Sequence, residues 1–518
     1  MKRQISRLMV IVGVACFCVG TVSAEEAIKL KTSKEISGSI FGTQVHFVQS
    51  WKYKEVLPLI ENAGFKWIAE GCPWSQIERE KGVLKMPDEK FPHTKKFIDD
   101  AVARGLNVIV TLDCPPYKLY PTEDFEAFKR GYANYCSFVA KSLKGKVKVW
   151  KMWNEPTNNF RKRVKNGGSW NAKEGTDTVW LRKYAELTIV GAKAVKAVDP
   201  DAIIIAGSCV APVNHHFLDI LKEKGGIELV DALLLHPYPF KLPPEVQPYG
   251  GAVIKERDGI DAADDDHTYL SILRRLREKM KAVGMKSTDI YINEFGYTTF
   301  YRTLGSPKGG DTVYEAFSYE AQAKYLARYW FLHLVGEVKA AIQYDFHDDS
   351  IGVNKHPEGH FGMIKRKSQN YEPKPAFYVV QRMCALFSDP VKLFKNGFAV
   401  TANPDRYLDS KNWKYIEPSM VWDGQEIQSL NRVEKYLFKN ADTGEVLLVL
   451  WNAVRASDRQ DLMSTVTLDM TDYAGFTGVD IMTGKSFKVN ASTKDGKTIL
   501  KDVVIPDYPV IIKMSPKK

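Results

Sequence analysis

Two glutamates that each follow a short apolar run have the clearest chemical potential in this chain. Glu155 follows Val149–Met152 within a Trp-Asn-Glu-Pro motif, and Glu294 follows Ile290–Ile292 within an Asn-Glu-Phe-Gly motif. Cleavage of a glycosidic bond uses two carboxyl groups that flank the bond. Two parallel strands that end at one face of a barrel supply such a pair. The sequence therefore predicts a glycosidase.

The elements that must position these glutamates alternate along residues 38–388. Short apolar runs alternate there with longer amphipathic segments, which is the pattern of repeated βα units, and eight such units predict an α/β fold, the (β/α)8 TIM barrel. The expected strands are Ile40–Phe47, Phe65–Ala69, Asn107–Leu112, Val147–Trp153, Ala202–Ala206, Ala232–Leu235, Ile290–Asn293 and Ala340–Tyr344. The expected helices include Tyr53–Ala63, Thr94–Arg104, Asp124–Leu143, Trp180–Val198, Tyr269–Val283, Tyr319–Leu334 and Lys374–Phe387.

After Ser388 the pattern changes to the alternation typical of strands. Val446–Trp451 and Val510–Met514 are examples, and turn signals separate such runs. We therefore expect residues 25–388 to form the barrel and residues 389–518 to form an all-β sandwich that packs rigidly against it. Residues 25–37 are a candidate edge strand.

Three motifs of this chain resemble those of clan A of the glycoside hydrolases, a group of retaining β-glycosidases. They are Trp153-Asn154-Glu155-Pro156, Leu235-His236-Pro237-Tyr238 and Ile292-Asn293-Glu294-Phe295-Gly296. Families 39 and 5 of the clan look most similar. The resemblance implies that Glu155 is the acid/base, protonated at rest, and that Glu294 is the nucleophile.

The resemblance also implies a set of residues that bind the sugar. Asn154 would bond the sugar 2-hydroxyl, His236 and Tyr238 would lie beside the nucleophile, and Tyr344 would form an aromatic floor. Two further residues are candidates for substrate binding. Trp170, in the connection after Glu155, is a possible stacking platform, and His46 lies near the end of the first expected strand.

One departure from the clan pattern lies at the end of the second strand. Many clan members carry an arginine there that supports the nucleophile, whereas this chain has Ala69 and Glu70. Either another residue, such as Arg302, supplies the positive charge, or the site is tuned differently. The departure also favours a rival hypothesis, a catalytically silent glycan-binding barrel.

The connection after Glu155 is rich in bases, with Arg161, Lys162, Arg163 and Lys165 before Trp170. Beside a leaving group, this charge would favour a sulfated or uronic-acid glycan. A solvated loop is the alternative meaning of such a run. The sequence does not identify the sugar.

The N-terminus predicts export. Lys2, Arg3 and Arg7 precede a mostly apolar stretch, and small residues lead up to Ala24, so we expect a signal peptide of residues 1–24, a secreted or periplasmic protein and no membrane span. Lipid anchoring at Cys16 is a minor alternative.

The net charge of +11 includes those three bases, so the remaining chain carries +8. This charge is mild, and no nucleic-acid-binding motif accompanies it.

Cysteine and histidine spacing indicates no metal site and no cofactor, since His46, His236, His347 and His356 are scattered. We expect most of the cysteines to be buried thiols, and a disulfide between Cys72 and Cys114, which follow neighbouring strands, is the alternative. The sequence as a whole predicts a secreted retaining β-glycoside hydrolase that acts on an oligo- or polysaccharide. A transglycosylase with the same covalent intermediate is a further alternative.

Overall fold

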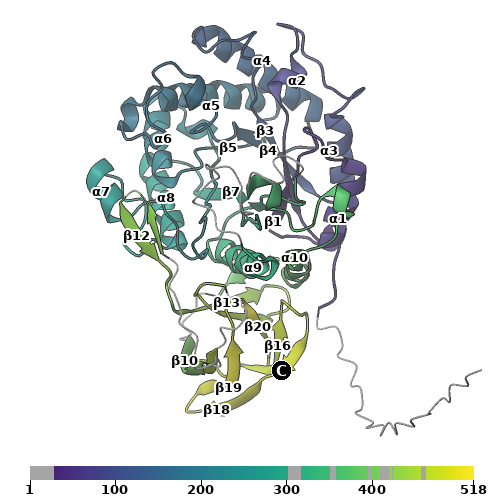
Figure 1. The fold of residues 1–518 in the computed structure, drawn as a ribbon, viewed down its shortest axis with the longest axis vertical. Coiled ribbons are helices and arrows are strands. Elements are labelled where there is room, and N and C mark those ends of the chain that lie inside the picture. Colours follow the sequence, from purple (N-terminus) through teal and green to yellow (C-terminus); the bar gives the residue numbers. More distant parts are fainter. Residues whose placement is uncertain are drawn as a thin grey trace, which may run out of the picture.

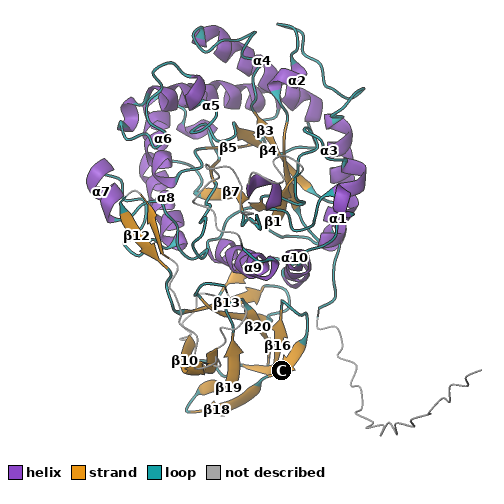
Figure 2. Cartoon of the chain, viewed as in Figure 1, coloured by secondary structure: helices purple, strands orange, loops and turns teal. Residues whose placement is uncertain are grey.

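The N-terminal part of the chain is a closed barrel of parallel strands surrounded by helices (Figures 1 and 2). The computed structural model describes residues 28–300, 317–349, 357–394, 400–407, 419–422, 424–456 and 462–517. The expected signal peptide with Cys16, and also Arg302 and His356, lie outside them. The barrel strands are β1 (Phe41–Gln44), β2 (Trp67–Gly71), β3 (Asn107–Leu112), β4 (Val149–Met152), β5 (Ile203–Ala206), β6 (Ala232–Leu235), β7 (Asp289–Phe295) and β8 (Ala341–Gln343).

The strands pair in sequence order, and β8 closes the barrel by pairing with β1. β4 and β6 are buried along their whole length, because barrel strands are covered by helices outside and by other side chains inside. Apolar side chains such as Ala69, Ile109 and Val149 fill the interior. The TIM barrel predicted from the sequence is confirmed.

Most helices lie outside the barrel and bury one apolar stripe, whereas the helix Tyr319–Val335 is buried on all sides from Ala321 to His333. Local signals set their ends: Asp124 accepts a hydrogen bond from the Ala127 amide at the start of one helix, and Gly64 ends another in a left-handed conformation. The helices are α1 (Tyr53–Ala63), α2 (Trp74–Ile77), α3 (Thr94–Ala103), α4 (Phe125–Leu143), α5 (Val179–Val198), α6 (Ala211–Glu223), α7 (Ala252–Asp258), α8 (Tyr269–Val283), α9 (Tyr319–Val335) and α10 (Pro375–Leu386).

The C-terminal part consists of antiparallel sheets, as expected for a sandwich. One sheet has the order β17-β16-β20-β14-β13-β9, the other β10-β15-β19-β18, and β11 pairs with β12 in a separate hairpin. The strands are β9 (Val391–Leu393), β10 (Val400–Tyr407), β11 (Ser419–Trp422), β12 (Gln425–Gln428), β13 (Val433–Asn440), β14 (Val446–Asn452), β15 (Leu462–Leu468), β16 (Tyr473–Asp480), β17 (Ser486–Lys488), β18 (Asn490–Lys494), β19 (Lys497–Ile505) and β20 (Val510–Pro516).

Helices α9 and α10 lie between the barrel and the C-terminal sheets (Figure 1). The Arg328 guanidinium of α9, 0% exposed, pairs with Glu245 and donates a hydrogen bond of 2.7 Å to the Val454 carbonyl of the C-terminal part. The indole of Trp451, on β14, donates to the same glutamate over 2.7 Å. Barrel and sheets therefore share one buried interface, which agrees with the rigid packing expected from the sequence.

Two expectations from the sequence are wrong. Residues 28–40 contain no strand: Thr32 and Glu35 form a capping box around a short 3-10 turn, Ser33–Glu35, so the expected edge strand is replaced by a turn. Cys72 and Cys114 are free thiols, so the alternative of a disulfide is wrong: Cys72 is buried in the barrel wall, whereas Cys114 itself has a φ of 53° and faces a cleft. Within the described ranges, none of the helices is long and apolar enough to cross a bilayer.

Candidate active site

A cleft of about 880 Å³ opens at the carboxyl ends of the barrel strands, and both motif glutamates line it. Glu294 belongs to β7, and Glu155 follows β4 by three residues. Trp153 and Glu155 have φ angles of 75° and 43°, a left-handed conformation that costs non-glycine residues energy. This backbone turn directs the Glu155 side chain into the cleft.

The two carboxylates converge on one histidine. The Nδ1 atom of His236 lies 3.0 Å from Oε1 of Glu155 and 2.8 Å from Oε2 of Glu294. These three atoms lie within 4.8 Å of one another. The two carboxylates are thus closer than the roughly 6.5 Å at which a water molecule fits between a carboxylate and a sugar ring.

A buried lysine that the sequence analysis missed lies beneath this histidine. Lys151, on β4, is 1% exposed, and its Nζ lies 2.6 Å from Oδ1 of Asn154 and 3.2 Å from Nε2 of His236. Burial and the charge of Lys151 oppose protonation of His236, but the charges and hydrogen bonds of Glu294 and Glu155 outweigh them and raise its pKa. His236 therefore donates toward the two glutamates.

The charges of the site hold Glu155 in its ionised form. Burial opposes this, but the hydrogen bond and the charge of His236, the Asn158 side chain and Lys151 outweigh it and lower the pKa of Glu155 to about 2. The expectation of a protonated Glu155 at rest is therefore wrong for the unliganded site. Burial lowers the pKa of Lys151, and the nearby Glu294 and Glu155 carboxylates limit that effect.

The aromatic residues expected beside Glu294 are present. The hydroxyl of Tyr238 donates to Oε1 of Glu294 over 3.3 Å, and Tyr344 lines the same cleft. The Tyr344 ring packs edge-on against Phe361, with centroids 5.5 Å apart. Two of the predicted sugar-binding residues thus frame the Glu294 side of the cleft.

The end of strand two carries buried acids instead of an arginine. Glu70 is 2% exposed and accepts hydrogen bonds from the amides of Gly71 and Val48, at 2.7 and 3.2 Å. Burial raises the pKa of Glu70 to about 7 and that of neighbouring Asp113 to about 6. A buried cation of this site, Lys151, lies on strand four.

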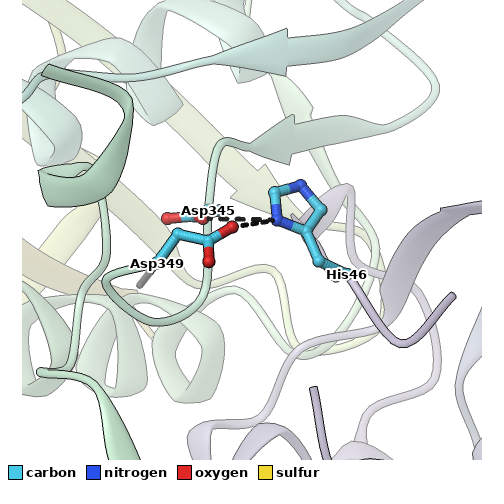
Figure 3. A group of neighbouring side chains, drawn as sticks. All are labelled: His46, Asp345 and Asp349. Atoms are coloured by element: carbon cyan, nitrogen blue, oxygen red, sulfur yellow. Dashed lines mark hydrogen bonds and ion pairs between the residues drawn. The ribbon is translucent and has the colours of Figure 1, made fainter. Parts of the chain in front are cut away.

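A second histidine and two aspartates meet beside the cleft (Figure 3). Nδ1 of His46 lies 3.0 Å from Oδ2 of Asp349 and 3.9 Å from Oδ2 of Asp345. Although burial opposes protonation, the hydrogen bond to Asp349 and the charges of Asp345 and Glu70 raise the pKa of His46 to about 9. From their spacing in the sequence, His46 and His236 were interpreted as scattered and not as parts of a ligand group. In the structure each of them lies beside two carboxylates.

Either histidine group has the spacing to hold a metal ion, since the ligating atoms in each lie within 4.8 Å of one another. In the group of His46, an imidazolium paired with Asp349 balances one of the two carboxylates without an ion. His46 itself lines the cleft, as predicted, whereas Asp345 is 0% exposed and lies behind it.

The basic run after Glu155 is used mainly for structure. Nε of Arg161 donates to the Thr157 carbonyl over 2.9 Å, and the Arg163 guanidinium lies 4.9 Å above the Tyr117 ring. Lys162 lines the cleft together with Trp170, which is 38% exposed. The run therefore places at least one cation, Lys162, at the cleft.

Phe240, Tyr249 and Trp422 are among the cleft residues that were not found from the sequence. Trp422 belongs to the β11–β12 hairpin of the C-terminal part, far along the chain from the glutamates. No motif marks these residues, because an aromatic side chain at a rim has the same sequence appearance as one in a core.

No protein-family model matches the chain. A 6-phospho-β-glucosidase of Clostridium longisporum is 26% identical over 189 residues, which make up 33% of this chain and 39% of that protein. The match thus spans well under half of the relative.

Solved structures match more of the chain. A family 39 glycoside hydrolase from the gut symbiont Bacteroides cellulosilyticus WH2 has a TM-score of 0.64 and 18% identity, and the match covers 95% of this chain and 83% of that one. A glucosidase from Croceicoccus marinus has a TM-score of 0.53 and 12% identity, over 95% and 99% of the two chains. These likenesses confirm the predicted resemblance to barrel glycoside hydrolases at the level of the fold.

Proposed function

We propose that this protein is a retaining β-glycoside hydrolase, and one observation carries the proposal. Glu155 and Glu294, from β4 and β7, converge with carboxylate oxygens less than 4.8 Å apart. Retaining glycosidases hold their carboxyl groups about 5–5.5 Å apart, whereas inverting ones need about 6.5–9.5 Å for the attacking water. The observed approach supports direct attack by a carboxylate.

In the first step a bond forms between a Glu294 oxygen and the anomeric carbon, while the bond from that carbon to the leaving oxygen breaks and the leaving oxygen takes a proton from Glu155. In the second step Glu155 removes a proton from water, whose oxygen attacks the anomeric carbon and releases Glu294. Tyr238 orients Glu294 through its hydroxyl. Asn154, held by Lys151, would bond the sugar 2-hydroxyl.

Glu155 must gain a proton before it acts, because its pKa is held near 2 in the unliganded cleft. A sugar that enters between the carboxylates would take the place of the His236 contact and would shield Glu155 from water. Both changes favour the neutral acid. Substrate binding thus prepares the proton donor.

The relatives support the reaction class. Two structures that align with 95% of this chain are described as a family 39 glycoside hydrolase and a glucosidase, and the partial relative is a 6-phospho-β-glucosidase. We further propose export, with cleavage after Ala24, from the charge and apolar pattern of the N-terminus. N-terminal sequencing of the protein recovered outside the cytoplasm would test this.

The reaction is tested with the full chain on aryl β-glycosides and on β-linked oligosaccharides, with NMR of the anomeric proton. We expect retention, and losses of several orders of magnitude in Glu155→Gln and Glu294→Gln. Azide should restore Glu155→Ala with a β-glycosyl azide product and Glu294→Ala with an α-glycosyl azide product. Inverted products would contradict the mechanism, and binding without cleavage, equal in wild type and variants, would show a glycan-binding barrel.

A further inference from the structure

The β11–β12 hairpin extends from the C-terminal part to the barrel, where it lies beside α7 (Figure 1). The amide of Gln425 donates to the Gly250 carbonyl over 2.9 Å, and its oxygen accepts from the Val253 amide over 3.2 Å. Met420 and Ile427 bury their side chains with apolar residues of the connection after β6. The hairpin is therefore fixed to the barrel rim by polar and apolar contacts.

This anchoring holds Trp422 within a group of four aromatic rings that we name the aromatic wall: Trp170, Phe240, Tyr249 and Trp422. The Trp422 ring stacks on Phe240, with centroids 5.4 Å apart and planes at 18°. It meets Tyr249 and Trp170 edge-on, at 5.8 and 6.5 Å. All four rings line the cleft that holds the glutamates.

The aromatic wall extends from Trp170 to Phe240, whose ring lies 6.5 Å from that of Tyr238. Its end at Trp170 and Tyr249 lies on the Glu155 side of the cleft. Burial raises the pKa of Tyr249, and the nearby charge of Glu155 adds to the effect, which places the phenol within electrostatic reach of this carboxylate. Trp170 belongs to the connection that follows Glu155. The opposite side, near Glu294, carries Tyr344 and Phe361.

We propose that the aromatic wall is the binding site for the leaving-group part of the substrate, and that its occupant is a pyranose ring of a β-linked oligosaccharide. This rests on the proposed function, since the acid/base residue marks the leaving-group side. A sugar ring has C–H groups that pack on an aromatic face, and a rigid ring platform loses little conformational entropy on binding. The C-terminal part thereby takes part in substrate recognition through Trp422.

The test compares substrates with and without a sugar on the leaving-group side. Tri- and tetrasaccharides of β-linked glucose, xylose and mannose are paired with the glycosyl fluorides of the same sugars, in which fluoride leaves. In Trp422→Ala we expect kcat/KM for the oligosaccharide to fall at least about tenfold, mainly through KM, because one lost stacking contact is worth about 1.4 kcal/mol or more. The fluoride should change less than about twofold.

Val421→Ala is the matched control, because Val421 neighbours Trp422 on the same strand and is 73% exposed. It should leave both substrates unchanged. Trp422→Phe, which keeps a ring, should restore part of the oligosaccharide rate.

Three outcomes would overturn the proposal: equal losses on oligosaccharide and fluoride, no loss on either, or equal losses in the valine control. Failure of the proposed function is distinguishable, since wild type would then cleave no fluoride at all. In that case, isothermal titration with the same tetrasaccharides still tests the site: weaker binding by Trp422→Ala would support it and unchanged binding would refute it.

Discussion

Nζ of Lys151 lies 3.2 Å from Nε2 of His236, and the opposite nitrogen of that ring reaches both Glu155 and Glu294. A buried cation on β4 therefore acts on the carboxylate pair through a histidine. The positive charge of Lys151 thus enters the site from strand four.

Replacement of this cation should reduce activity without unfolding the protein. Lys151→Met keeps the side-chain volume but removes the donor to His236 and Asn154, so we expect kcat/KM on an aryl glycoside to fall about 100-fold or more, in the range of a lost electrostatic contact at an active site. The alkaline limb of the pH profile should also move to higher pH, since Glu155 acts in its protonated form and its pKa rises when Lys151 no longer lowers it.

Lys148→Met is the control, because Lys148 is exposed near the start of the same strand. Circular dichroism would verify that both variants fold. An unchanged rate and pH profile in Lys151→Met would show that this lysine only fills space.

The pair of His46 and Asp349 should make stability depend on pH. The pKa of His46 is raised from 6.5 to about 9, so its contribution is complete below pH 6.5 and is lost as pH rises through 9. The free energy of unfolding should fall by on the order of 3 kcal/mol over that range, as measured by urea denaturation at constant ionic strength.

Two comparisons isolate this effect. Glu70, with a pKa of about 7, titrates in the lower part of the range, so the slope above pH 7 reports mainly His46. In His46→Gln the slope between pH 7 and 9 should flatten. If the variant keeps the wild-type slope, other groups carry the dependence.

Removal of divalent cations should leave the protein unchanged. The His46 imidazolium already compensates Asp349, and His236 already bonds both glutamates. We therefore expect dialysis against EDTA to alter neither Tm nor the rate on an aryl glycoside. A fall in Tm that zinc, manganese or calcium reverses would instead identify a metal at one of these groups.

The buried pair between barrel and sheets should dominate the stability of their interface. Arg328→Met would leave Glu245 charged and buried without its partner, so we expect a loss of about 3–5 kcal/mol in the free energy of unfolding. Arg274→Met removes an exposed pair and should cost less than about 1 kcal/mol. Equal effects of the two substitutions in denaturant titrations would refute the special role of Arg328.

The sequence is sufficient for the barrel and for the two glutamates because both have local signals. Strands such as Asn107–Leu112 are continuous apolar runs between amphipathic helices, and Glu155 and Glu294 sit in distinctive motifs. Lys151 gives no such signal: a lysine inside a short strand is typical of a solvated edge, and only closure of the barrel turns it inward. Burial and partner are properties of the closed fold.

The aromatic wall was missed for a different reason. Trp422 reaches Phe240 across a separation of 182 residues, and neither residue has a neighbour in sequence that indicates a cleft. The turn at Ser33–Glu35 was not predicted from the sequence. There the capping-box hydrogen bonds between Thr32 and Glu35 favour a turn over the strand that the surrounding composition indicates.

Placement of Trp422 late in the chain has a consequence for synthesis on the ribosome. The barrel strands and both glutamates precede residue 419, so a nascent barrel holds its reacting groups before the hairpin has been made. Domains commonly fold in the order in which they emerge. The cleft is then complete only after the hairpin has emerged, and a nascent chain that ends before residue 419 carries both glutamates without Trp422.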